Sequence, residues 1–136
     1  MDASSIIPTL LIASLIVAST PIMLAAIGEL VVERAGVLNL GVEGMMITGA
    51  ICGFIVAYET GSPTYGVIAS ILGGAALSLI FAILTQFFLA NQVASGLALT
   101  LFGLGFSALI GKGYTGITPP DLSSPNLGFL TEIPFL

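Results

Sequence analysis

Four of the nine charged side chains of this otherwise apolar chain lie in one short segment, residues 28–44. The segment contains Glu29, Glu33 and Glu43, three of the seven acidic residues, and Arg34, one of only two basic residues. Carboxylates accept hydrogen bonds and can exchange protons. A charge left at the centre of a bilayer costs about 2.5–3.5 kcal/mol on insertion scales. The segment must therefore lie at the water boundary, line a wet cavity or pair its own charges.

The composition explains why a bilayer is the relevant solvent. The chain has 136 residues, of which 57% are hydrophobic and 7% charged, and its mean hydropathy is +1.17. Soluble domains carry about 25% charged residues, so this chain could not cover a soluble surface. Long apolar runs predict an all-α, polytopic integral membrane protein in contact with the lipid bilayer.

Several function classes are disfavoured by the residue types. The net charge of −5 argues against nucleic acid as a partner, because nucleic acid attracts clustered Lys and Arg. Cys52 is the single cysteine and histidine is absent, so the usual disulfide, metal and general-base patterns are missing. We expect no catalytic residues, no metal and no cofactor, and therefore not an enzyme.

Four apolar runs predict about four transmembrane helices. The expected spans are 6–27, 40–58, 64–89 and 93–110. Pro21 falls inside the first span and should kink it. Residues 1–110 form the membrane region. Residues 111–136 are rich in Gly, Pro, Ser and Thr, which predicts an extended loop that stops before a further apolar span.

Small residues recur within the second and third spans at the spacing used for close helix packing. They are Gly49, Gly53, Gly66, Ser70 and Gly74. Because lipid provides no hydrophobic drive between helices, close backbone approach and packing hold spans together. We expect these residues to pack against one another or against a second subunit, and a solute path beside them is the alternative.

The first half of the charged segment is typical of a helix end. Glu29 and Glu33 are four residues apart and share one helical face, where like charges repel mildly. Arg34 can offset this repulsion or extend toward lipid phosphates. These three residues predict the end of the first helix at the membrane boundary.

The second half of the segment permits a break in the helix. Breaks are favoured by glycine, and this half contains Gly36, Gly41 and Gly44. Asn39 supplies donors and an acceptor, and Glu43 begins the next apolar run without a basic residue nearby. Transporters place broken helices beside a central cavity. Two interpretations of Asn39 and Glu43 remain equally open. They have a role in a cavity or hinge, or they lie in a solvated loop.

A second polar site separates the third and fourth spans. Asn91 and Gln92 fit a headgroup boundary, and a role in a solute pathway is the alternative. Ser95 and Thr100 lie within the fourth span, where such hydroxyls usually bond carbonyls of their own helix.

Two motifs now support a family resemblance. Residues 28–50, GELVVERAGVLNLGVEGMMITGA, resemble the hallmark segment of membrane permease subunits of ABC importers. The branch is the branched-chain amino acid/ribose type, and within it the nucleoside or simple-sugar permeases. Residues 90–99, ANQVASGLAL, resemble a second signature of this branch. Residues 117–120 and 132–136 resemble its extracytoplasmic loop.

The resemblance implies a multi-subunit machine in the cell membrane. Its expected partners are a second permease subunit, two cytoplasmic ABC ATPase subunits and an extracytoplasmic solute-binding protein. Arg34 and Lys112 fall on opposite sides of a four-span arrangement, so charge alone sets no orientation. The resemblance implies an extracytoplasmic N-terminus. Permeases of this family are about twice as long, so the chain corresponds to an N-terminal half of a larger permease bundle.

The leading hypothesis is a permease subunit for ATP-driven import of nucleosides or simple sugars. Its expected pathway residues are Asn39, Glu43, Asn91 and Gln92, and its expected hinge residues are the three glycines of the break. A branched-chain amino acid permease of the same family is one alternative. A non-transporting four-span assembly or scaffold protein is the other.

Overall fold

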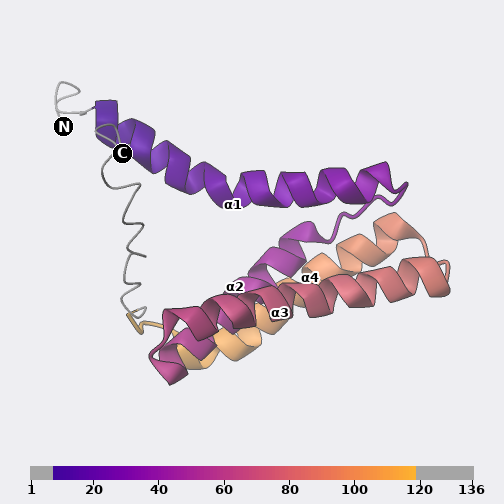
Figure 1. The fold of residues 1–136 in the computed structure, drawn as a ribbon. Helices are drawn as coiled ribbons and strands as arrows, with labels where there is room; N and C mark the ends of the chain where they lie inside the picture. Colours follow the sequence, from indigo (N-terminus) through magenta and orange to yellow (C-terminus); the bar gives the residue numbers. More distant parts are fainter. Residues whose placement is uncertain (1–7, 119–136) are drawn as a thin grey trace.

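The computed structural model describes residues 8–118, which form four long helices (Figure 1). All four are long and apolar enough to cross a membrane, and residues 8–118 contain no strand. The prediction of an all-α fold with about four membrane helices is confirmed. The helices are α1 (Pro8–Arg34), α2 (Val42–Thr60), α3 (Pro63–Ala82) and α4 (Gln92–Gly111).

The helix ends differ in detail from the expected spans. α1 continues to Arg34, so it includes the residues expected at the membrane boundary. α3 continues as a π-helical turn, Ile83–Phe87, inside the expected span of 64–89. α4 continues as a 3-10 turn, Lys112–Tyr114, where the sequence predicted loop. Residues 6 and 7 of the first expected span, and residues 119–136 of the expected loop, lie outside the described part of the chain.

α1 lies apart from the other three helices, along one side of the bundle (Figure 1). None of the most apolar 18-residue stretch of α1 is buried, whereas a third of the corresponding stretch of α2 is. The axis of α1 changes direction near its middle, and Pro21 lies inside this helix. A proline in a helix interior removes one hydrogen bond and produces such a bend.

α2 and α3 form a tight antiparallel pair. Gly61 ends α2 in the left-handed conformation, with φ of 64°, and Pro63 begins α3 at its first turn. The expected packing residues lie between these helices: a Cβ added to Gly49 would lie 2.9 Å from the Ser70 carbonyl oxygen. The Ser70 hydroxyl donates to the Gly49 carbonyl oxygen at 2.7 Å.

The remaining members of the packing row lie along the same contact. A Cβ on Gly66 would lie 2.6 Å from the Ala57 Cβ, and a Cβ on Gly53 would collide with the Ser70 hydroxyl. Gly74 is less constrained, since its nearest neighbour would be the Met45 carbonyl oxygen at 3.6 Å. Small side chains thus let the α2 and α3 backbones approach closely.

α2 also crosses α4 at a glycine pair. A Cβ on Gly103 would lie 2.6 Å from the Gly44 carbonyl oxygen, and a Cβ on Gly44 would lie 2.5 Å from the Leu99 carbonyl oxygen. Gly44 was expected in the helix break, but it lies inside α2 and serves this crossing. Leu77, Phe81 and Leu99 form the buried core nearby.

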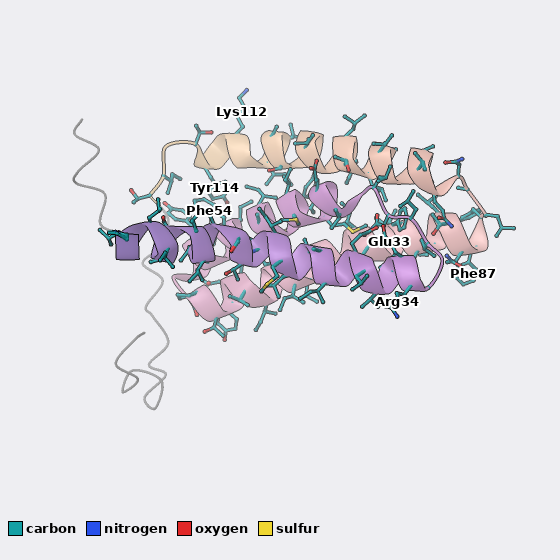
Figure 2. The ribbon with its side chains drawn as sticks, turned by 90° about the horizontal axis from the view of Figure 1, so that it is seen from above. Glu33, Arg34, Phe54, Phe87, Lys112 and Tyr114 are labelled. Atoms are coloured by element: carbon teal, nitrogen blue, oxygen red, sulfur yellow. The ribbon has the colours of Figure 1, made fainter. Side chains whose placement is uncertain are left out.

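The two ends of the bundle carry different side chains. Arg34 and Lys112 lie at opposite ends (Figure 2). Near Lys112, the Tyr114 ring packs edge-on against Phe54, with centroids 6.3 Å apart, and its hydroxyl donates to Glu59 Oε1 at 2.8 Å. This contact ties the end of α4 to α2.

The glycine crossing can be tested with two alanine variants of one helix. Gly103→Ala should lower the free energy of unfolding by about 1–3 kcal/mol, because its methyl group would meet the α2 backbone. Gly105→Ala is the matched control, since nothing lies within 4 Å of its added Cβ. Thermal unfolding in detergent, followed by circular dichroism, measures both. Equal melting temperatures for the two variants would contradict the crossing.

Candidate functional site

The connection between α1 and α2 begins with a defined helix stop. Gly36 has a φ of +83°, which suits glycine, and its N–H donates to the Glu33 carbonyl at 2.9 Å. The Val37 N–H donates to the Val32 carbonyl at 3.2 Å. These two bonds form a Schellman motif, in which freed carbonyls at the helix end regain partners. Residues 35–41 thus connect α1 to α2, and we call this connection the helix break.

Asn39 organises the second half of this break. Its side chain is buried, with 7% of the residue exposed. Its Oδ1 accepts a hydrogen bond from the Gly41 N–H at 2.9 Å, and its Nδ2 lies 3.6 Å from the Met45 sulfur. An Asn side chain that bonds the backbone two residues ahead mimics a turn and positions the start of the next helix. Asn39 therefore sets the direction in which α2 leaves the break.

α4 holds the break from the other side. The Leu38 N–H donates to Gln92 Oε1 at 2.8 Å, and the Thr100 hydroxyl donates to the Leu40 carbonyl at 3.0 Å. The expectation that Thr100 bonds its own helix is wrong, because its partner is 60 residues away. Asn91 caps α4, and its side chain accepts from the Ala94 N–H at 3.0 Å.

Glu29 reaches the same break from α1. Its Oε1 accepts a hydrogen bond from the Asn39 N–H at 3.0 Å. Its Oε2 is buried and has no hydrogen-bond partner among the described residues. Glu33 and Arg34, one turn farther along, are exposed. Glu29 therefore departs from the boundary position expected for all three residues, because it points into the bundle.

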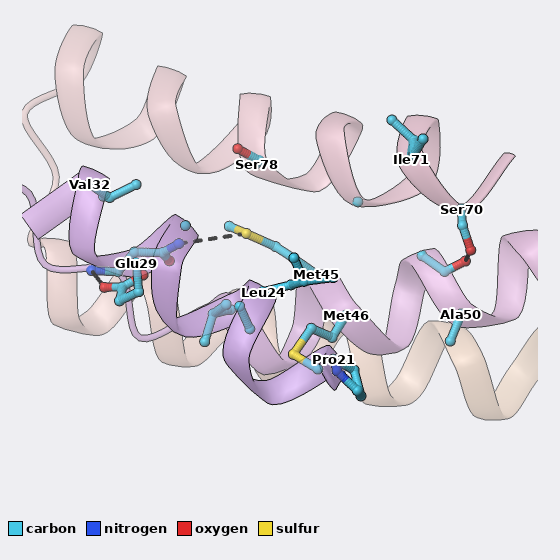
Figure 3. Close-up of a pocket in the computed structure, with 16 residues that line it drawn as sticks. Pro21, Leu24, Glu29, Val32, Met45, Met46, Ala50, Ser70, Ile71 and Ser78 are labelled. Atoms are coloured by element: carbon cyan, nitrogen blue, oxygen red, sulfur yellow. Dashed lines mark hydrogen bonds between the residues drawn. The ribbon is translucent and has the colours of Figure 1, made fainter. Parts of the chain in front are cut away.

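Between α1, α2 and α3 lies an open cavity of about 790 Å3 (Figure 3). Four polar side chains line it: those of Glu29, Asn39, Ser70 and Ser78. Its apolar wall includes Pro21, Leu24, Met45, Met46 and Ile71. Small-molecule sites are typically about 300–1,000 Å3, with apolar walls and a few placed polar groups. The cavity has the size and chemistry to hold a small organic solute.

The cavity gathers some of the predicted residues and not others. Of the four expected pathway residues, Asn39 lines it, whereas the other three do not. Glu43 is exposed in the first turn of α2, and Asn91 and Gln92 begin α4. The cavity is also lined by three residues of the packing row, Gly49, Ser70 and Gly74. The close contact between α2 and α3 therefore borders the cavity. Gly41 and Gly44 are both buried, against Gly96 and Leu99 of α4.

Sequence reasoning missed Glu29 and Ser78 as cavity residues. A usable signal existed for Glu29, because it lies one helical turn deeper in the apolar run than Glu33. At that depth, a carboxylate facing lipid is costly and is expected to face the bundle interior. The cavity position of Ser78 depends on how α3 is rotated, which one serine in an apolar run does not reveal.

Comparison with known proteins places this arrangement in context. Residues 11–131 match the family model described as "Branched-chain amino acid transport system / permease component". A putative glucose ABC transporter permease protein of Haloferax volcanii is 43% identical over 125 residues, which cover 88% of this chain and 37% of that protein. No solved structure matches the chain.

Two further relatives are named for nucleosides. The guanosine ABC transporter permease protein of Bacillus subtilis is 33% identical over an alignment that covers all of this chain and 46% of that protein. A nucleoside ABC transporter permease protein of Lactococcus lactis subsp. cremoris is 30% identical over 98 residues, 68% of this chain and 31% of that protein. The chain thus spans less than half the length of these relatives. The family model covers most of its residues, and the chain belongs to the branched-chain amino acid transport system permease family.

Proposed function

We propose that this chain is the N-terminal part of a permease subunit of an ATP-driven importer for nucleosides or simple sugars. It forms part of the solute pathway and performs no bond chemistry. The observation that carries the proposal is the cavity, where the Glu29 carboxylate and the buried Asn39 meet beside a break between two helices. Broken helices beside a cavity are how transporters offer polar groups to a solute inside a membrane.

The proposed partners follow from this role. They are a second permease subunit, cytoplasmic ABC ATPase subunits that supply the energy, and an extracytoplasmic solute-binding protein that delivers the solute. The chain would cross the cell membrane several times, with its N-terminus outside. The end of the bundle with Arg34 and the helix break would then face the cytoplasm, and the end with Lys112 would face outward (Figure 2).

The cavity favours nucleosides or sugars over branched-chain amino acids. An amino acid is zwitterionic, and its carboxylate requires a cation or a set of strong donors. Among the described residues, no Lys or Arg side chain lines the cavity. Neutral solutes that carry hydroxyl donors suit the Glu29 carboxylate without that requirement. The scaffold alternative gives this cavity no role.

A transport assay tests the proposed function. Cells that express this chain with its partner subunits should take up radiolabelled guanosine or glucose, and uptake should stop when the ATPase is inactivated. Leucine is the third solute, as a probe for the amino acid alternative. Uptake of leucine alone would contradict the proposed substrate class. Failure to co-purify with any ATPase, together with no uptake of the three solutes, would favour the scaffold.

The pathway role of Asn39 can be separated from that of Glu43. Asn39→Ala should reduce the initial uptake rate at least tenfold, because the buried Gly41 N–H loses its acceptor beside the cavity. Glu43→Gln should leave uptake within twofold, because Glu43 is exposed and lies outside the cavity. Membrane content, measured by immunoblot, should be unchanged in both variants. Normal uptake by Asn39→Ala would remove Asn39 from the pathway.

The orientation can be tested by cysteine labelling. In a Cys52→Ala background, Lys112→Cys should react with a membrane-impermeant maleimide in intact cells, because that end of the bundle faces outward. Arg34→Cys, at the opposite end, should react only after the membrane is permeabilised. The reverse pattern would place the N-terminus in the cytoplasm.

A further inference from the structure

The polar groups of the cavity are few, and two are already engaged within the protein. The Asn39 amide oxygen accepts from the Gly41 N–H at 2.9 Å, and the Ser70 hydroxyl donates to the Gly49 carbonyl at 2.7 Å. Glu29 gives one oxygen to the Asn39 N–H, and its second oxygen has no partner in the described part of the chain. A buried carboxylate oxygen without a donor is costly. It is therefore the strongest acceptor available to a bound solute.

The rest of the cavity offers a different kind of contact. Met45 and Met46 come from α2, and Pro21 and Leu24 lie opposite on α1. In Figure 3 the Met46 side chain lies beside Pro21, whereas the Met45 sulfur reaches toward the Asn39 amide. Thioethers adapt to flat surfaces and make favourable contacts with aromatic rings. The cavity thus combines a hydrogen-bond acceptor at the helix break with a polarisable apolar wall.

We propose that Glu29 receives the hydroxyl donors of the solute, while the wall formed by Met45 and Met46 receives an aromatic ring. This inference rests on the proposed function and assigns the solute to the nucleoside class. The ribose hydroxyls would point to the helix break and the base would lie along the wall. The last side-chain torsion of glutamate is soft, so a small rotation brings the second oxygen to the solute. The Asn39 N–H keeps the carboxylate in place.

A hexose fits this cavity poorly. It carries hydroxyl groups around its whole ring, and each buried hydroxyl that finds no partner weakens binding. The cavity walls are mainly apolar, with Met, Leu, Pro and Ile side chains among their residues. A nucleoside places its ribose hydroxyls at one end, where they suit Glu29. Its base offers flat aromatic faces to the wall, while the polar edge of the base faces the open side of the cavity. Nucleosides should therefore be preferred over glucose.

The conservative variant Glu29→Gln tests this assignment. Its amide oxygen can still accept from the Asn39 N–H, so the helix break is retained, but its second group becomes a donor. The probes are guanosine and 2′,3′-dideoxyguanosine, which lacks the 2′ and 3′ hydroxyl donors of the ribose and keeps the 5′ hydroxyl. Glu29→Gln should raise the KM for guanosine uptake about tenfold. The KM for the dideoxy compound should change less than twofold.

Glu33→Gln is the matched control, because Glu33 lies one turn away on α1 and is exposed. It should leave both KM values unchanged, and wild-type uptake of guanosine should have a KM at least tenfold below that of glucose. An equal rise in both nucleoside KM values for Glu29→Gln would overturn the assignment, as would a glucose KM at or below that of guanosine. A wild-type importer that transports neither solute would instead contradict the proposed function itself.

Discussion

The backbone groups that α1 and α2 leave unpaired where they meet need partners, and the structure around residues 35–41 follows from that constraint. A buried backbone N–H or C=O without a partner costs free energy comparable to a lost hydrogen bond. The Schellman bonds at Gly36 satisfy carbonyls at the end of α1. The Glu29 carboxylate accepts from the Asn39 N–H, and Gln92 accepts from the Leu38 N–H. Thr100 donates to the Leu40 carbonyl.

These partners come from two different helices, α1 and α4, and this connects the break to the rest of the fold. Gln92 and Thr100 can reach it only because α4 approaches α2 closely at the Gly44–Gly103 crossing. Glu29 can reach it only because α1, which otherwise stands apart, ends beside it (Figure 1). Glu29 has two oxygens and the break uses one. The residue that stabilises the broken backbone thus also leaves an acceptor beside the cavity, which links the structural and the proposed functional roles of this segment.

The sequence predicted the class and the number of helices because apolar length is a strong signal in a membrane protein. It left a helix break at Gly36, Gly41 and Gly44 equally open with a solvated loop, because glycines beside Asn39 permit both. It did not predict that Gln92 would bond Leu38, because that contact depends on which face α4 presents to the break. To predict the inward position of Glu29, its depth in the apolar run has to be weighed against its four-residue spacing from Glu33. Gly44 was assigned to the break because it lies close to Gly41 in sequence. Sequence alone does not distinguish a glycine at a helix break from a glycine that packs against another helix.

The central claim is that the cavity between α1, α2 and α3 forms part of the solute path. Photo-crosslinking with 8-azidoguanosine, followed by peptide mass spectrometry, tests this most directly in membranes that contain the assembled importer. The account predicts that the label attaches to peptides of α2 that carry Met45 and Met46, and that excess guanosine prevents labelling. Guanosine-protected labelling confined to peptides outside α1, α2 and α3 would contradict it.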